Sequence, residues 1–189
     1  MKKLARLTAL LLTGALLLVL TACGTVPGGS AGMTNEEIAA KQWLLEEINS
    51  YRTTHDPSLA PLVEVEQLSD AEQELIEHFR AAGKAVLPES EGDEALDRWE
   101  SMTVGWDSCG SLGAVWKTDE DNKWIYILDA MVPANTPEGK TELLATLKDC
   151  PAFNISNCKS IGIAVVTINE QMYWTCTTFR KRSSPSPQA

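Results

Sequence analysis

The last third of the chain contains a pair of strand patterns that determines the middle of the fold. Residues 160–168 read SIGIAVVTI and are apolar on both of the faces that alternate along a strand. A strand that is apolar on both faces is normally covered on both sides. Residues 172–179 form a second strand pattern, and Asn169, Glu170 and Gln171 between the two predict a hairpin turn. We therefore expect a central hairpin with helices above and below it.

Helical patterns occupy most of the chain before this hairpin. Two of them open with a capping box, in which Thr34 or Ser69 is followed three residues later by a glutamate. A third pattern is weaker, and the fourth starts with a threonine cap and a proline at the first helical position. The four predicted helices run from Thr34 to before Pro57, from Ser69 to Gly83, from about Asp93 to Ser101 and from Thr136 to before Pro151.

A second hairpin is predicted where residues 112–117 and 124–131 flank a polar turn, whereas the segment from Trp99 to Trp106 and on to Cys109 is predicted to be irregular. The order is then helix, helix, helix, hairpin, helix, hairpin. This order predicts an α/β fold, a three-layer α-β-α sandwich with a central antiparallel sheet and about four helices.

The N-terminus has the pattern of an export signal. Three basic residues precede an uncharged, leucine-rich run over residues 7–20, which would rise only about 21 Å as a helix. A bilayer core of about 30 Å needs a longer run. A basic head, a short apolar body and small residues at its end are typical of a signal peptide.

Residues 20–24, LTACG, resemble the lipobox of bacterial lipoproteins. The resemblance implies cleavage before Cys23, a diacylglyceryl group on its thiol, and a chain that is lipid-anchored to the cell membrane and faces outside the cytoplasm. Two acyl chains suffice for stable anchoring. An ordinary secretory signal with an incidental cysteine is the alternative. The predicted organisation is a signal peptide over 1–22, a flexible tether over 23–33, a globular domain over 34–180 and a disordered tail over 181–189.

The charge of the mature chain argues against two classes of partner. The signal segment contains three of the 16 basic residues and none of the 26 acidic ones, so 13 basic residues face 26 acidic ones after cleavage. Such a chain is a poor candidate for binding nucleic acid or an anionic lipid surface. The run Arg180-Lys181-Arg182 is interpreted as the solvated end of the last strand.

Four cysteines remain besides Cys23, and an even number in an exported domain favours two disulfides. The short loop between Cys150 and Cys158 is easily closed, so we predict that these two pair and that Cys109 pairs with Cys176. The other two pairings, and four buried thiols, stay open as alternatives. No C-x-x-C pair is present and no histidine is near a cysteine, so neither a zinc site nor another cofactor is predicted.

Two stretches resemble the CAP superfamily, which contains cysteine-rich secretory, antigen-five and pathogenesis-related proteins. Residues 45–52, LEEINSYR, are similar to the family's first-helix signature. Residues 161–166, IGIAVV, with Tyr173, Trp174, Thr175 and Phe179, are similar to its closing hairpin. The resemblance spans about Glu36 to Phe179 and implies a CAP-like domain.

The resemblance does not extend to the family's metal pocket, which holds two histidines and two acidic residues. Residues 82–86 contain no histidine, Phe153 stands where the second histidine is expected, and residues 112–114 lack the glutamate. We therefore assign no metal ligand and no catalytic residue. A non-catalytic binding or scaffold module of the cell envelope is predicted, and a cell-envelope hydrolase with an unrecognised active site is the alternative.

A ligand groove is predicted at Trp99 and Trp106, which flank an irregular stretch, and the resemblance adds Phe153, which stands at the position of the family's pocket histidine. Its ligand would be a lipid, a glycan or a peptide of the envelope. The alternative is that these aromatic residues are simply part of the core. The other predicted partner is the membrane, through the N-terminal lipid.

Overall fold

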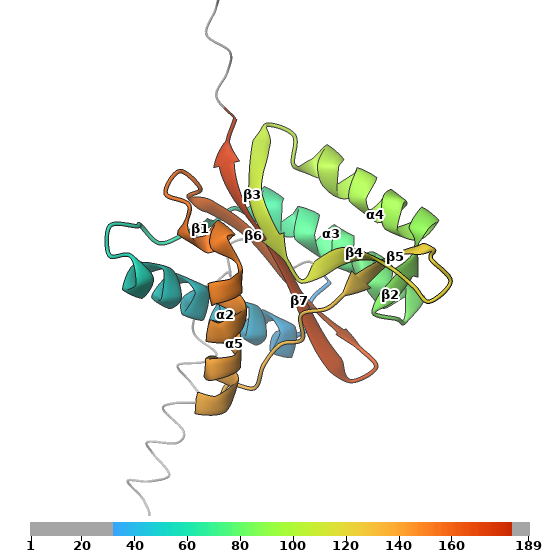
Figure 1. Cartoon of the computed structure of the whole chain (residues 1–189), viewed down its shortest axis with the longest axis horizontal. Coiled ribbons are helices and arrows are strands. Elements are labelled where there is room, and N and C mark those ends of the chain that lie inside the picture. Colours follow the sequence, from blue (N-terminus) through green and yellow to red (C-terminus); the bar gives the residue numbers. More distant parts are fainter. Residues whose placement is uncertain (1–31, 183–189) are drawn as a thin grey trace, which may run out of the picture.

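The computed structural model describes residues 32–182 (Figure 1). The predicted signal peptide, Cys23, most of the tether and residues 183–189 lie outside the described residues. The helices are α2 (Asn35–His55), α3 (Glu66–Ala82), α4 (Glu89–Met102), α5 (Pro137–Asp149) and the short 3-10 helix η1 (Pro151–Asn154). The strands are β1 (Val63–Glu64), β2 (Val86–Pro88), β3 (Trp106–Leu112), β4 (Ala114–Thr118), β5 (Trp124–Leu128), β6 (Ser160–Ile168) and β7 (Gln171–Lys181).

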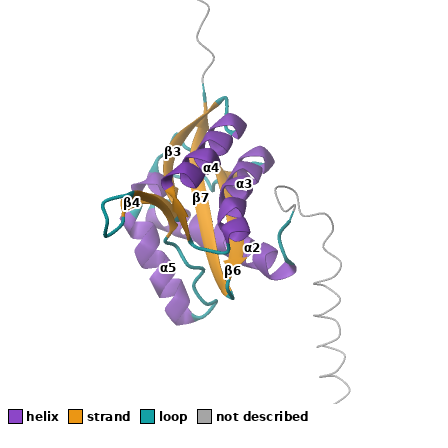
Figure 2. Cartoon of the chain, turned by 90° about the vertical axis from the view of Figure 1, so that its right-hand side faces the viewer, coloured by secondary structure: helices purple, strands orange, loops and turns teal. Residues whose placement is uncertain are grey.

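The main sheet has the strand order β1-β6-β7-β3, so the closing hairpin is central, as its sequence predicts. Strand β1 runs parallel to β6 and the other pairs are antiparallel, which makes the sheet mixed instead of purely antiparallel. A smaller sheet has the order β2-β5-β4. Helices α2 and α5 lie on one side of the main sheet and α3 and α4 on the other (Figures 1 and 2). The predicted α/β sandwich is confirmed.

Alternation along β6 explains why the molecule has two cores. Ile161, Ile163 and Val165 pack against α2 and α5, whereas Ala164 and Val166 pack against α3, α4 and β5. Gly162 lies directly beneath α3, since a Cβ at this position would come within 2.4 Å of the Leu68 carbonyl oxygen. The close approach of helix and strand therefore requires glycine here.

The first predicted helix start is confirmed and the second is wrong. Thr34 caps α2, with reciprocal bonds between Thr34 and Glu37 that complete the capping box. Helix α3 begins at Glu66, three residues before Ser69, and α4 begins at Glu89 instead of Asp93. Ser69 is buried inside α3, where its hydroxyl donates to Glu64 and accepts the Ile163 N–H. A tertiary contact to the sheet thus uses the residue that resembles a cap.

The strand predictions differ from the structure mainly at β3. The closing hairpin turns through Asn169 and Glu170, both with positive φ, as a two-residue hairpin turn requires. The predicted hairpin over 112–131 is present as β4 and β5. The irregular stretch predicted after Trp99 is in part strand β3, which pairs with β7 with a register shift between Ser108 and Gly110. Strand β7 reaches Lys181, the first residue of the predicted tail.

The disulfide joins Cys109 to Cys158, so the predicted pairing of Cys150 with Cys158 and of Cys109 with Cys176 is wrong. The register of β3 on β7 explains why Cys109 does not pair with Cys176, because the residue opposite Cys176 is Leu112. The loop from Cys150 to Cys158 is short in sequence, but the Arg52 guanidinium binds carbonyl groups along it. The closeness of two cysteines in sequence was therefore a poor guide.

Candidate functional site

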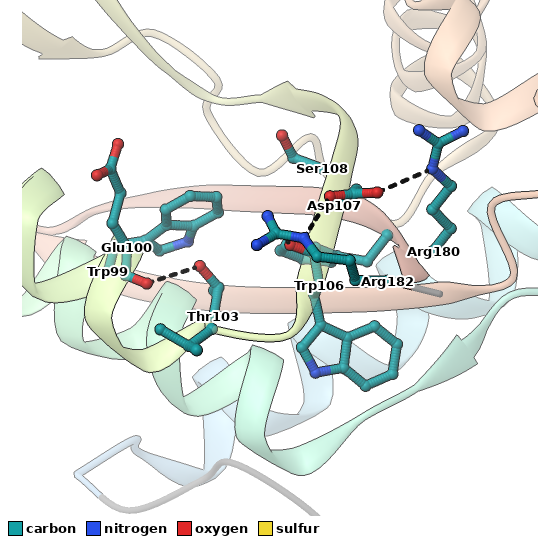
Figure 3. A pocket seen from close by; sticks show the side chains of 10 residues that line it. Trp99, Glu100, Thr103, Trp106, Asp107, Ser108, Arg180 and Arg182 are labelled. Atoms are coloured by element: carbon teal, nitrogen blue, oxygen red, sulfur yellow. Dashed lines mark hydrogen bonds and ion pairs between the residues drawn. The ribbon is translucent and has the colours of Figure 1, made fainter. Parts of the chain in front are cut away.

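A cavity of about 580 Å³ lies where the end of α4, the start of β3 and the end of β7 meet (Figure 3). Its lining residues are Trp99, Glu100, Thr103, Val104, Trp106, Asp107, Ser108, Phe179, Arg180 and Arg182. We call it the aromatic–arginine pocket. It exists because the turn after α4 brings Trp99 and Trp106 to the same end of β7.

Two tryptophans pack against one buried phenylalanine in this pocket. The Trp99 ring lies 5.8 Å from the Phe179 ring, centroid to centroid, with a tilt of 30°. The Trp106 ring meets the same phenylalanine edge-on at 6.4 Å. Both indoles are half-buried, while Phe179 is buried. Aromatic pairs at such separations are mutually attractive, so Phe179 holds the two indoles in fixed places.

A buried carboxyl group supports Trp99 from below. The Trp99 Nε1–H donates to Glu72 Oε1 at 2.8 Å, and Glu72 is a fully buried residue of α3. Burial raises the pKa of Glu72 above its ordinary value, and the hydrogen bonds from Trp99 and Thr177 act against that rise. The indole of Trp99 is therefore oriented by a hydrogen bond to a buried carboxyl group.

Two arginines share one carboxylate at the rim. The Nε–H of Arg182 lies 2.9 Å from Asp107 Oδ1, and the Nε–H of Arg180 lies 3.3 Å from Asp107 Oδ2 (Figure 3). The hydrogen bond from Arg182 holds the pKa of Asp107 below its ordinary value, with a smaller contribution from Arg180. Asp107 faces Arg180 in the β3–β7 register, which explains the contact. The lining residues Arg180 and Arg182 are balanced in formal charge by Asp107 and Glu100, and Asp107 is the carboxylate that both arginines contact.

The structure separates the three predicted groove residues. Trp99 and Trp106 line the same pocket, but Phe153 does not. Phe153 is only 1% exposed and belongs to the core under α2 and α5, where its backbone carbonyl accepts a hydrogen bond from Arg52. It occupies the interior as a core residue, which is the alternative interpretation that the sequence left open.

Sequence reasoning missed the polar half of the pocket. The run Arg180-Lys181-Arg182 was interpreted as a solvated strand end, and its alternation was not used. Arg180 lies in β7 and Arg182 follows its last residue, and both side chains reach the Asp107 carboxylate. Residues two apart along an extended chain lie on the same face. The signal was present in the sequence, although the partner Asp107 could be found only from the register of β3.

The other tryptophans occupy different environments. Trp174 is buried in the core and Trp43 is half-buried against that same core. Trp116 stacks on Tyr126, and Trp124 is 51% exposed on the β4–β5 hairpin. His55 is exposed and stacks on Tyr51, and His78 is partly exposed on α3. Within residues 32–182 no group of three or more histidine, cysteine, aspartate or glutamate side chains is placed to hold a metal ion. Over the same residues, no helix combines the length and the apolar character that crossing a membrane requires.

Comparisons with known proteins give little further information. No family model matches the chain, and no curated protein matches it. Among solved structures, an outer surface protein from Borrelia burgdorferi is similar with a TM-score of 0.46 and 12% sequence identity, over 76% of this chain and 94% of that chain. A likeness of this level carries no argument about function. The CAP-like resemblance therefore stays a prediction.

Proposed function

We propose that this chain is a lipid-anchored protein of the cell envelope, facing outside the cytoplasm, whose CAP-like domain binds an envelope ligand without converting it. The signal pattern and the LTAC sequence ending at Cys23 support the location. The Cys109–Cys158 disulfide is consistent with it, because such bonds persist mainly in oxidising compartments outside the cytoplasm.

The aromatic–arginine pocket is the observation that carries the binding function. A sugar ring presents an apolar face that packs on an indole, and the Arg180 and Arg182 guanidinium groups favour an attached oxyanion. Both Nη groups of Arg180 make no hydrogen bond within residues 32–182, so they are available to a carboxylate or a phosphate. The ligand class that fits best is therefore an acidic sugar of an envelope glycan.

The same pocket favours glycan over lipid and speaks against hydrolysis. An acyl chain needs a continuous apolar groove, whereas six of the ten lining residues are polar or charged. Ser108 and Thr103 offer hydroxyl groups, but no histidine lines the pocket. Asp107 is a weak general base because two arginines hold its pKa low. No observation favours the hydrolase alternative.

The test is a binding titration of the full chain in detergent, followed by NMR of the tryptophan indole N–H signals. We expect N-acetylmuramic acid and N-acetylglucosamine 6-phosphate to bind in the millimolar range and to shift the Trp106 signal. Uncharged N-acetylglucosamine should bind at least several-fold more weakly. The relative affinity of the two acidic sugars distinguishes a carboxylate from a phosphate ligand.

Variants locate the site. Trp106→Ala and Arg180→Gln should each weaken acidic-sugar binding about tenfold, since each removes one contact worth about 1.4 kcal/mol. Trp124→Ala, which removes an exposed tryptophan on the other sheet, is the matched control and should bind like the wild type. Equal binding of charged and uncharged sugars, or unchanged binding in Arg180→Gln, would contradict the proposal.

A further inference from the structure

Among residues 32–182, Cys150 and Cys176 are not bonded, and both lie on the same side of the main sheet. Cys176 is buried in β7 and belongs to the core under α2 and α5. Cys150 is half-buried between α5 and η1 and packs against that same core. Neither is used by the aromatic–arginine pocket. Both thiols therefore face the core under α2 and α5.

Helix η1 packs on strands β3 and β7 of the main sheet. The Thr178 hydroxyl donates to the Ala152 carbonyl oxygen at 3.4 Å, and a Cβ on Gly110 would lie 2.5 Å from the Ala152 Cβ. Gly110 and Thr178 are opposite each other in the β3–β7 register. Ala152 therefore lies directly over this pair of residues.

The next pair on the same face of β3 and β7 is Leu112 with Cys176, two residues along from Gly110 and Thr178. Cys150 precedes Ala152 by two residues in the sequence. Leu112 and Cys150 line one cavity of about 500 Å³, together with Trp174, which shares the face of Cys176. Cys150 and Cys176 therefore lie on the same face of the sheet, with Leu112 beside Cys176 in the register and in the wall of the cavity that Cys150 lines.

Both thiols have raised pKa values in the folded chain. Burial raises the pKa of Cys176 well above its ordinary value, and the charges of Glu72 and then of Cys150 raise it further. Burial also raises the pKa of Cys150.

We propose that Cys150 and Cys176 form a second disulfide when the chain folds outside the cytoplasm. Cys109 and Cys158 are already bonded and Cys23 is the predicted lipid site, so these two are the remaining partners. The segment from Cys150 to Cys158 would then be held to β7 at its start and to β3 at its end. Arg52 holds its middle through carbonyl groups.

The chemistry is an exchange with the disulfide of an envelope thiol oxidoreductase. The Cys150 thiolate attacks that disulfide, forms a mixed disulfide and releases one oxidant thiol. The Cys176 thiolate then attacks the Cys150 sulfur and releases the second oxidant thiol. Two protein thiols are oxidised, one oxidant disulfide is reduced, and the two thiol protons end on the oxidant sulfurs. Because Cys176 is buried and its pKa is high in the folded chain, the step takes place before the core closes.

Peptide mapping of the full chain, purified from membranes, tests this directly. The protein is unfolded without reductant, alkylated with iodoacetamide, digested and analysed by mass spectrometry. We expect two linked peptide pairs, Cys109–Cys158 and Cys150–Cys176, and no alkylated cysteine. Alkylation of Cys150 and Cys176, or a link of either one to another cysteine, would overturn the proposal.

Paired variants provide an independent measurement. In Cys109→Ala/Cys158→Ala, the melting temperature should still fall on addition of dithiothreitol, because only the second bond is left to reduce. Loss of a bond that closes about 27 residues lowers the folding equilibrium constant by a few hundredfold in the chain-entropy model. The Cys150→Ala/Cys176→Ala variant controls for packing and should keep only the sensitivity to dithiothreitol that belongs to Cys109–Cys158. A double variant of the first kind that is indifferent to dithiothreitol would also overturn the proposal.

Discussion

At the scale of single residues, the stretch that resembles a family signature acts as a set of loop anchors. Asn49 accepts the Leu62 N–H at 2.7 Å and donates to the Leu62 carbonyl oxygen at 3.1 Å. Arg52 is 1% exposed and donates to four carbonyl groups, those of Ala60, Phe153, Ile155 and Cys158. Burial lowers the pKa of Arg52, and the Asp56 charge opposes this effect. Asn49 and Arg52 thus tie α2 to two segments of the chain, the loop before β1 and the segment between α5 and β6.

Replacing Arg52 with methionine should be among the most harmful single changes. Two of the four hydrogen bonds, those to Phe153 and Cys158, are buried. Each buried carbonyl group left without a donor costs about 1–3 kcal/mol, so we expect a loss of roughly 2–6 kcal/mol of unfolding free energy. Urea unfolding measures it. Arg98→Met is the control, because Arg98 is 59% exposed and, within residues 32–182, its side chain pairs with Glu74 alone; its change should stay within about 0.5 kcal/mol. Similar losses in the two variants would contradict the anchoring role of Arg52.

At the scale of elements, Glu37 joins three parts of the fold. Its carboxylate caps α2 through the Thr34 N–H, pairs with Arg80 of α3 at 2.9 Å and accepts the Thr167 N–H of β6 at 2.6 Å. Burial by itself raises the pKa of Glu37, but the hydrogen bonds from Thr34 and Thr167 and the charge of Arg80 outweigh it, and the pKa is lowered overall. The ionised form is therefore the one that the fold stabilises.

The free energy of unfolding should therefore depend on pH through the ionisation of Glu37. A carboxyl whose pKa is lowered by folding contributes stability above its ordinary pKa near 4.5, and loses it as the pH falls through the lower folded value. Glu37→Gln should lower the unfolding free energy at pH 7 by about 1–3 kcal/mol and flatten its decline below pH 4.5. Urea titrations between pH 3 and 7 test this, with the exposed Glu46→Gln as control. An unchanged slope in Glu37→Gln would refute it.

The two capping-box patterns show how far sequence reasoning reaches at this scale. Thr34 and Glu37 cap a helix, whereas Ser69 and Glu72 have the same spacing but are buried inside one. Local spacing is identical in both cases, so only the tertiary contacts of Ser69 with β6 and of Glu72 with Trp99 distinguish them. The central hairpin was predictable because its apolar pattern is strong. Strand β3 was not, since it is an edge strand with a register shift and few apolar residues.

The same limit applies to the pocket. The sequence brought attention to Trp99 and Trp106 through their residue type alone. Asp107 and Arg180 could not be paired in advance, because they are 73 residues apart and meet only through the β3–β7 register. Phe153 was assigned to the groove by its alignment with a family motif, and the structure places it in the core instead. Contacts between distant strands are the information that local patterns lack.

At the scale of the whole molecule, the charge balance makes the predicted lipid the decisive attraction to a membrane. With 26 acidic and 13 basic residues after the signal segment, the mature chain is repelled by anionic lipid. Two acyl chains anchor stably where one is marginal.

Cys23→Ser should therefore move nearly all of the protein from the membrane fraction to the medium or periplasm. Cell fractionation and the intact mass of the N-terminal peptide measure both parts of this claim. Cys150→Ser keeps the LTAC sequence and should stay with the membrane, which separates anchoring from a general effect of losing a cysteine. Membrane retention of Cys23→Ser, together with a wild-type peptide that carries no lipid mass, would show that the segment is an ordinary secretory signal.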